Sequence, residues 1–551
     1  MIDAIFLPPE PMDQMMVGDL IENLIWKPIN HFETRYIHSF EEAQTEDIIL
    51  VLPGAYHKVE DINREIARFK SVLIFLTSDE NNIFPVEELK HGNMKLWIQT
   101  PRVGREYPAG TRFFGVGYGF AHLKAREYSK KYKDVFISGQ DTHARRHKIF
   151  NLLDEYEKKN PELDYFINRT KGFTQGYSEE MYFKLMNSTK VAPAPAGVVS
   201  PDSFRVYEAL ECGVIPIADD ISPAYDSKGY WAKLFPDTPM PILADDNISD
   251  ILDTELANYS WRSIQIYAWW QQQKRKYAYD LLEDLTYLIG NGHSFSEIIK
   301  GKERELKDRI TAIIPVSPWA SHPDTRILEE TIRNTQAQLP GAEIIVTFDG
   351  VRAEQEDRRE AYETFVMTML RKINFEYENV LPIVFKEHTH QVGMAREALK
   401  YVKTQTIIYI EGDSPLYPDR HIPWQELITD IEWGDSNVIR LYNKEEIPEE
   451  HEYLMHHEHD VPKLNLIATS QWSQQPHLAN TNFYREIVDK YFTSDAKCFV
   501  EERMYYIIVS ESRNGQWRNW RMFIYKPDNL PRSYHLDGRE GGNNFYESQV
   551  F

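Results

Sequence analysis

The sequence predicts an α/β protein of several domains. At 551 residues the chain is too long for one hydrophobic core, because domains usually contain ~100–200 residues. Apolar runs of strand length recur along it, and segments whose apolar residues have helical spacing lie between them. One such run, residues 407–410, ends in Glu411 and Asp413. We therefore expect three domains, over residues 1–120, 121–290 and 305–551.

The first two predicted domains begin with continuous apolar strands. Strands are expected at residues 48–53 and 71–76 in the first domain, and at residues 135–140 in the second. The second domain should close with an aromatic helix around residues 267–270, and the charged stretch from 300 to 309 predicts a solvated helical linker. Both domains are therefore expected to contain a sheet covered by helices.

A helix near the middle of the second domain carries candidate binding residues. It should begin near Asp202 or Ser203 and stop at Gly213, before a short buried strand. The amides at a helix N-terminus attract phosphate, and Arg205 and Glu208 lie three apart on one face. A plainer alternative is an ordinary capped helix, in which Arg205 and Glu208 form a surface ion pair that contributes little.

This pattern resembles the exostosin-like glycosyltransferases, whose GT-B fold consists of two Rossmann-like lobes. The resemblance implies that Ser203 and Arg205 hold the diphosphate of a nucleotide-sugar donor and that Glu208 holds its ribose. The strand at 135–140 and the loop after it resemble that family's phosphate-facing loop, which implies that Arg146 faces the donor diphosphate.

The C-terminal half has the order strand, helix, strand, helix, strand. Its expected strands are residues 311–317, 343–348 and 407–410, and its expected helices include residues 327–332 and 391–399. Residues i and i+2 of a strand point to the same side, so Glu411 and Asp413 can meet one divalent cation. Ligands bind at this end of the strands in open α/β sheets. The alternative is that both acids are solvated turn residues or helix caps.

These five elements resemble the GT-A nucleotide-sugar glycosyltransferases, especially those of family 2, from residue 311 to the C-terminus. The resemblance implies that Pro315 and Ser317 lie where the nucleotide base and ribose dock, and that Asp349 lies near the base. It also implies that Arg396, on a helix crossing the sugar diphosphate, pairs a phosphate oxygen.

The same resemblance assigns the metal and the catalytic base. Glu411 and Asp413 stand where the family has its DxD motif, although Glu replaces the first Asp, so that Glu411 contacts either metal or ribose. Asp413 is then the metal ligand for Mn²⁺ or Mg²⁺, and we expect its carboxylate to be exposed. Glu502 is the first choice for the base and Glu501 the second. His535 stands where many GT-A enzymes have a late metal ligand or a phosphate-gripping lid, although a lone histidine is usually structural.

Composition limits the environment and the partners. The two cysteines, Cys212 and Cys498, fall in different predicted domains, so a disulfide framework is not expected. Neither a signal peptide nor an apolar run of ~18 residues is evident, so we expect no membrane partner and a cytoplasmic protein, in the host cytoplasm if phage-encoded. A net charge of −23 argues against broad nucleic-acid binding.

Two local clusters remain after these assignments. Residues 513–521 interleave arginines with Trp517 and Trp520, which suits stacking on a base or sugar beside a phosphate. The alternative is that both tryptophans pack inside the protein. Residues 456–460 contain three histidines, a glutamate and an aspartate at irregular spacing, which favours a loop near the acceptor over a transition-metal site.

Together these features predict a glycosyltransferase that takes its sugar from a nucleotide-sugar donor, expected to be UDP-linked. The acidic, tyrosine-rich chain with paired modules resembles bacteriophage enzymes that glycosylate 5-hydroxymethylpyrimidines in DNA. This resemblance implies an acceptor such as DNA carrying 5-hydroxymethylcytosine, or the sugar already attached to it. Two alternatives stay open, a glycosyltransferase of capsule or lipopolysaccharide assembly and a carbohydrate-binding scaffold whose transferase folds are inactive.

Overall fold

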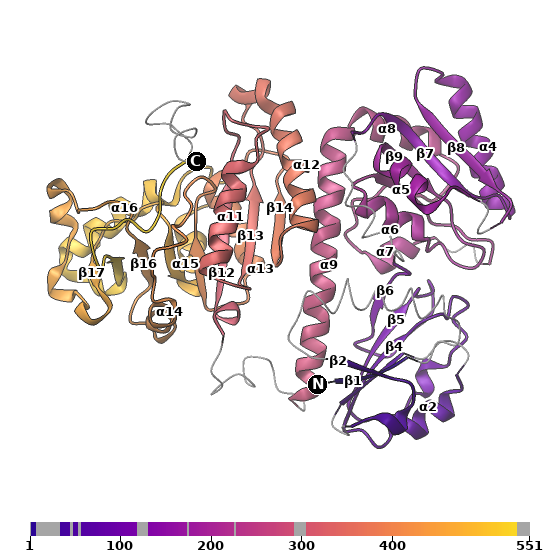
Figure 1. The fold of residues 1–551 in the computed structure, drawn as a ribbon, viewed down its shortest axis with the longest axis horizontal. Helices are drawn as coiled ribbons and strands as arrows, with labels where there is room; N and C mark the ends of the chain where they lie inside the picture. Colours follow the sequence, from indigo (N-terminus) through magenta and orange to yellow (C-terminus); the bar gives the residue numbers. More distant parts are fainter. Residues whose placement is uncertain are drawn as a thin grey trace. The chain divides into compact units, whose positions relative to one another are not determined.

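The structure, a computed structural model, describes residues 2–6, 34–44, 48–52, 57–117, 130–172, 176–224, 228–290 and 305–536. The chain forms two compact units, Met1–Gly301 and Lys302–Phe551. Each unit is built of sheets and helices, and most neighbouring strands in them are parallel (Figure 1). The expected α/β class is confirmed.

The first unit begins with a six-stranded sheet in the order β2-β1-β3-β4-β5-β6, in which every pair is parallel. The expected strands at 48–53 and 71–76 form as β3 and β4, and residue 53 lies outside the described residues. All six residues of β4 are buried, because helices or loops cover both faces of a parallel sheet. The elements are β1 Ile2–Phe6, β2 Thr34–Ile37, β3 Ile48–Leu52, α2 Val59–Ile66, β4 Ser71–Leu76, β5 Met94–Gln99 and β6 Arg112–Phe114.

A second parallel sheet follows in the same unit, in the order β11-β10-β9-β7-β8. The strand β7 pairs with β8 on one side and β9 on the other, so the strand order reverses between β7 and β9. Ligands bind at such a switch point, beyond the carboxyl ends of the strands. The elements are β7 Lys133–Gln140, α4 Ala144–Lys159, β8 Tyr165–Thr170, α5 Glu179–Asn187, β9 Thr189–Ala194, α6 Phe204–Glu211, β10 Ile215–Asp219, α7 Tyr230–Leu234, β11 Ile242–Leu243 and α8 Ile248–Ala257.

The long helix α9, Tyr259–Ile289, packs against elements of both sheets of this unit (Figure 1). Near its start, Trp270 Nε1 donates to Glu211 Oε1 of α6 over 2.6 Å. Near its end, Asp284 accepts from Trp97 Nε1 of β5 over 2.9 Å and pairs with Arg112 of β6. The aromatic helix expected around residues 267–270 therefore contributes to the packing of both sheets, not of the second alone.

The second unit contains one eight-stranded sheet in the order β14-β13-β12-β15-β18-β16-β19-β17. The strands β14, β13, β12 and β15 are parallel, whereas β18 runs antiparallel to β15 and β16. The order reverses between β12 and β15. The elements are β12 Ile310–Val316, α11 Arg326–Gln338, β13 Glu343–Phe348, α12 Arg359–Phe375, β14 Val380–Val384, α13 His390–Tyr401, β15 Thr406–Tyr409, α14 Trp424–Trp433, β16 Val438–Leu441, β17 Leu466–Ala468, β18 His477–Asn480, α15 Thr481–Tyr491, α16 Val500–Glu511 and β19 Met522–Tyr525.

All five elements expected between residues 311 and 410 form within one or a few residues of their predicted bounds. The strand β15 ends at Tyr409, and Glu411 and Asp413 follow it directly, beside the carboxyl end of β12. The acid pair therefore lies at the switch point of the sheet, where open α/β sheets bind their ligands.

Candidate functional site

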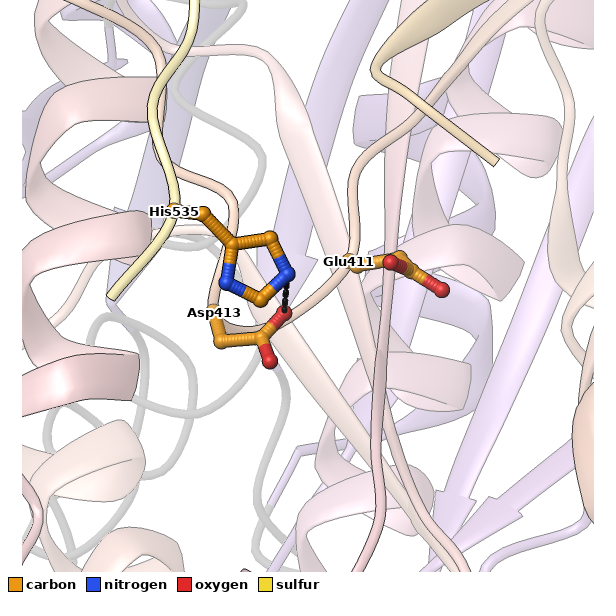
Figure 2. Close-up of side chains that lie close together, drawn as sticks. All are labelled: Glu411, Asp413 and His535. Carbon is orange, nitrogen blue, oxygen red and sulfur yellow. Dashed lines mark ion pairs between the residues drawn. The ribbon is translucent and has the colours of Figure 1, made fainter. Parts of the chain in front are cut away.

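The acid pair after β15 gains a third ligand-type side chain from the C-terminal segment. Glu411, Asp413 and His535 each offer one atom, and the three atoms lie within 4.8 Å of one another. Figure 2 shows the His535 ring turned towards the Asp413 carboxylate, with Nε2 3.8 Å from Oδ1. Two carboxylates and an imidazole can hold a divalent cation, so the residues present fit the metal that the sequence suggests.

Backbone pairing brings His535 to this place. The amide of Leu536 donates to the carbonyl of Asp413 over 2.8 Å, and Ser533 forms an isolated antiparallel bridge with Leu416. The residues after Asp413 and the last described residues of the chain therefore run side by side. His535 itself remains half exposed, since 49% of its side chain is accessible.

Gly412 allows the acid pair to approach β12 closely. Its amide donates to the carbonyl of Pro315 over 3.0 Å, and its own carbonyl accepts from the Thr331 hydroxyl over 2.8 Å. A Cβ at this position would lie 3.0 Å from the Pro315 carbonyl oxygen and 3.0 Å from the Trp319 ring. A larger residue would therefore displace the turn that carries both acids.

The expectation that Asp413 is exposed was wrong. Its side chain is only 5% accessible, because the segment around His535 covers it, whereas Glu411 is half-buried. Burial raises the pKa of Tyr484 on α15, and the nearby negative charge of the Glu411 carboxylate raises it further. The acid pair therefore lies in a partly dry environment, where charge interactions are stronger than in water.

The two acids at the start of α16 differ in their surroundings. Glu502 is exposed, whereas Glu501 is half-buried and accepts from the Gln474 amide over 3.1 Å. Burial raises the pKa of Glu501 above its ordinary value. Gln391 at the start of α13 connects this region to the donor side, because its Oε1 accepts from the amide of Val500 over 3.1 Å. Of the two acids predicted as the catalytic base, Glu501 is the more buried.

Asp349, which the resemblance puts near the nucleotide base, is buried after β13. Its carboxylate accepts from the amides of Gly350, Thr389 and His390, at 2.9, 2.6 and 3.1 Å. His388 Nδ1 lies 2.8 Å from Asp349 Oδ2. Asp349 therefore fixes the loop before α13, which carries His388 and His390, two histidines that the sequence analysis did not single out.

The remaining predicted donor residues of this unit are spread more widely. Pro315 and the half-buried Ser317 lie at the end of β12, beside the acid pair. Arg396 lies on α13, but its guanidinium donates to the carbonyls of Val488 and Phe492 at the end of α15, over 3.0 and 3.1 Å. In this arrangement Arg396 joins two helices, and its donors are directed at backbone carbonyls rather than at the acid pair.

A polar row across the sheet was missed by the sequence analysis. Tyr409, His477 and Arg440 are direct cross-strand neighbours on β15, β18 and β16, and each is less than 5% exposed. Among the described residues, the Tyr409 hydroxyl, His477 Nε2 and Arg440 Nε have no hydrogen-bond partner. Burial lowers the pKa of His477 to about 4 and that of Arg440 to about 10. Each residue is one polar member of an apolar strand, a signal too weak to find them from sequence.

The predicted diphosphate site of the first unit lies at the β7/β9 switch point. Arg205 Nε donates to the carbonyl of Ser138 in β7 over 2.7 Å, and Arg146 Nε donates to the carbonyl of Ala196 after β9 over 2.9 Å. Burial and the neighbouring charge of Arg205 lower the pKa of Arg146 to about 10. A Cβ on Gly139 would collide with the Arg205 guanidinium, so glycine makes room for it. The positively charged guanidinium groups of Arg146 and Arg205 therefore lie close together where the sequence predicts a diphosphate.

Ser203 and Glu208 complete the predicted set around the α6 helix. Ser203 is the buried N-cap residue of α6, and within the described residues its side chain makes no capping hydrogen bond. Glu208 accepts from the Tyr182 hydroxyl over 2.6 Å, and burial raises its pKa. The surface ion pair between Arg205 and Glu208, the plainer alternative, is not among the ion pairs of the described residues.

Asp202, which the sequence suggested only as a possible first residue of this helix, has a structural role. It accepts from the hydroxyls of Tyr230 and Tyr207 over 2.7 and 2.9 Å, and from the amide of Val116 over 2.9 Å. Val116 follows the last strand of the first sheet, so Asp202 joins the two sheets of this unit. Burial raises the pKa of Asp202 to about 6.

The two clusters left open by the sequence have structural roles. Trp517 and Trp520 are 5% and 4% exposed, so the alternative that they pack inside is confirmed and they offer no stacking surface. His457 lies between Asp460 and Glu452 at 2.9 Å from each, and the His459 ring stacks on Trp517. Both cysteines remain thiols. No helix in the described part of the chain combines the length and hydrophobicity needed to cross a membrane.

Comparisons with known proteins give weak similarities. No family model matches the sequence, and no curated protein matches it significantly. Among solved structures, the 1–349 fragment of S. aureus TarS aligns with a TM-score of 0.27 and 13% identity, over 41% of this chain and 60% of that one. The mannosyltransferase PcManGT from Pyrobaculum calidifontis, in complex with GDP-Man and Mn²⁺, aligns with a TM-score of 0.27 and 12% identity, over 44% of this chain and 64% of that one.

A third structure, 4-diphosphocytidyl-2C-methyl-D-erythritol synthase from Anaerococcus prevotii, aligns with a TM-score of 0.24 and 13% identity, over 42% of this chain and 93% of that one. The alignment spans less than two thirds of the first two structures. At these TM-scores and identities the likeness carries no conclusion about activity, so the function must be argued from the site.

Proposed function

We propose that the chain is a glycosyltransferase that moves a sugar from a nucleotide-sugar donor to an acceptor hydroxyl. The observation that carries this proposal is the meeting of Glu411, Asp413 and His535 at the switch point of the second unit's sheet. A ligand-type cluster at that position suits a nucleoside diphosphate whose phosphates need a neutralising cation.

The three side chains would hold Mn²⁺ or Mg²⁺. Asp413 is the central ligand of this proposal because it is the most buried of the three, and His535 adds a nitrogen donor from the C-terminal segment. When bound, the ion supplies positive charge to the diphosphate that leaves the sugar. Pro315 and Ser317 at the end of β12 are the proposed contacts to the base and ribose, with the Asp349 loop beside them.

Glu501 is the proposed catalytic base, in preference to Glu502. It would accept the proton of the acceptor hydroxyl while the oxygen of that hydroxyl bonds to the anomeric carbon and the bond from that carbon to the diphosphate breaks. Burial that raises the pKa of a carboxylate makes it a stronger base, and Glu501 is half-buried whereas Glu502 is exposed. The hydrogen bond from the Gln474 amide and the charge of the buried Arg440 both oppose this rise in the pKa of Glu501.

The first unit is proposed to bind a second nucleotide sugar without a metal. Arg146 and Arg205 supply the positive charge for a diphosphate, and the N-terminus of α6 with Ser203 lies next to them. Glu208, held by Tyr182, would contact the ribose. Two adjacent guanidiniums repel one another, and a bound diphosphate would relieve that repulsion.

Three acceptor interpretations follow from the sequence. DNA carrying 5-hydroxymethylcytosine stays the specific candidate from the sequence, with a glycan of capsule or lipopolysaccharide assembly as the alternative. The burial of Trp517 and Trp520 removes the stacking surface on which the DNA interpretation depended. A scaffold with inactive transferase folds is a third candidate, and it predicts donor binding without turnover.

Titration calorimetry with UDP, and then GDP, tests the metal site in the presence of Mn²⁺. The Asp413→Asn variant keeps the side-chain volume of this buried position while removing its charge, and we expect it to weaken Mn²⁺-dependent nucleotide binding by about 100-fold or more. Asp419→Asn, which changes an exposed carboxylate on the same loop, is the matched control and should bind as the unaltered protein does. Equal affinity of Asp413→Asn and the control would exclude the site.

A further inference from the structure

An aromatic surface lies on the outer side of α16. Tyr506 is 74% exposed and Tyr453 is 56% exposed, unusually high values for aromatic residues. The Tyr453 and Tyr505 hydroxyls are 2.8 Å apart, the Tyr505 and Tyr506 rings meet edge to face at 5.5 Å, and the Arg513 guanidinium lies 5.5 Å from the Tyr453 ring centre. We call these four residues, Tyr453, Tyr505, Tyr506 and Arg513, the tyrosine ledge.

The tyrosine ledge begins one helical turn from the proposed base. Tyr505 is four residues after Glu501 on α16, so the two side chains lie on the same helix face about 6 Å apart along its axis. The inner side of Tyr505 packs against the cluster that contains Tyr442, and the Arg440 guanidinium lies 5.4 Å from the Tyr442 ring centre. On the other side of Glu501, Phe499 meets the His390 ring at 4.6 Å. A molecule lying on the ledge could therefore reach Glu501.

The ledge offers neutral hydrogen-bonding groups beside ring faces. The hydrogen bond between Tyr505 and Tyr453 and the partial burial of Tyr505 raise the pKa of Tyr505 to about 12, so its hydroxyl stays neutral at physiological pH. Rigid tyrosine rings provide apolar area, and the hydroxyls at their edges donate and accept hydrogen bonds. Both features match a sugar, whose C–H face stacks on rings while its hydroxyls need polar partners.

The charges around the ledge decide between acceptor classes. Tyr453 belongs to the short helix Glu449–Leu454, and Glu449, Glu450 and Glu452 on that helix are all exposed. Glu452 pairs with His457, and the other two carboxylates still outnumber the single arginine of the ledge, so they repel a polyanion such as DNA. A neutral molecule meets no such barrier.

Resting on the proposed function, we propose that the tyrosine ledge binds the acceptor and that this acceptor is a neutral carbohydrate. Tyr506 and Tyr453 supply the ring faces on which the sugar rings of the acceptor stack. Tyr505 lies next to them, one helical turn from Glu501. The acceptor hydroxyl then reaches Glu501 from the face of α16 that carries Tyr505.

Saturation-transfer NMR on the full chain, with maltotriose, cellotriose, chitotriose and mannotriose as probes, tests this proposal. We expect at least one trisaccharide to bind, and its affinity to fall about tenfold in Tyr506→Ala and in Tyr453→Ala. Tyr506→Phe keeps the ring and should retain most of the affinity. Trp433→Ala is the matched control, because Trp433 is a 79% exposed aromatic on α14 outside the ledge.

Two results would overturn the proposal. One is that no trisaccharide binds, or that binding is equal in the two alanine variants and in Trp433→Ala. The other is that a duplex containing 5-hydroxymethylcytosine binds to the ledge and loses affinity in the same variants, which would make the acceptor a polyanion. Failure of the proposed function is separate, because trisaccharide binding needs neither Mn²⁺ nor Asp413. If the ledge binds sugar while Mn²⁺-dependent nucleotide binding is absent, the ledge stands and the transferase proposal fails.

Discussion

Replacing Asp202 with asparagine should change how the stability of the first unit depends on pH. The carboxylate is buried between the two sheets of that unit and accepts from Tyr207, Tyr230 and Val116. Burial raises its pKa more than these donors lower it, and the folded-state value is about 6 against an ordinary value of 3.8. Asparagine has nearly the same shape but does not titrate.

The sign and size of the change in the free energy of unfolding follow from the difference between the folded-state and unfolded-state pKa of Asp202. A folded-state pKa above the unfolded one means that the protonated form favours folding, so this contribution is complete below pH ~4 and is lost as the pH rises through ~6. At about 1.4 kcal/mol per pKa unit, the full titration changes the free energy of unfolding by about 3 kcal/mol. About 2 kcal/mol of this should be lost between about pH 4.5 and about pH 7.5.

Hydrogen exchange measured by mass spectrometry in increasing urea can follow this change in peptides from α6 and β10. Measuring exchange in individual peptides separates the unfolding of the first unit from that of the second. A two-state analysis of the whole chain would not separate them. The free energy of unfolding of the unaltered protein minus that of Asp202→Asn should fall by about 2 kcal/mol over that pH range. A difference that stays constant, or rises with pH, would show that the tyrosine hydroxyls outweigh burial and would refute the reasoning.

Further predictions concern the two nucleotide sites. Residues 1–301 should bind a UDP-sugar in EDTA, and calorimetry should show loss of binding in Arg205→Ala and Arg146→Ala; a strict need for Mn²⁺ there would contradict the metal-free site. Glu501→Gln should lower turnover by a factor of ~10²–10⁴ while sparing nucleotide affinity, with Glu502→Gln as the matched control. Steady-state rates of UDP release would check this, and a larger effect in Glu502→Gln would reverse the assignment.

Much of the fold could be predicted from local sequence. A strand buried on both faces must be apolar at every position, so runs such as residues 71–76 and 311–316 identify themselves. The acid pair after β15 could also be predicted, because i and i+2 residues at a strand end share a side. The five elements expected between residues 311 and 410 all form, but α12 and β14, which lie between β13 and α13, were not predicted.

Side-chain environments could not be predicted in this way. Asp413 is buried because the segment carrying His535, far along the chain, pairs with the turn after β15. Glu501 and Glu502 are adjacent and chemically alike, and only the packing of α16 directs one inward. Arg396 suits a phosphate by type, yet the end of α15 presents carbonyls that bind it first.

The sequence by itself therefore determined the α/β class, the positions of the most apolar strands and the acid pair, because these depend on periodicity and composition within short segments. Tertiary structure decided which groups meet: His535 with Asp413, Arg146 with Arg205, and Tyr453 with Tyr505. It also buried Trp517 and left Tyr506 exposed. The physical reason is that local pattern specifies which side of an element is apolar, whereas the partner of that side is chosen by contacts between segments distant in the chain.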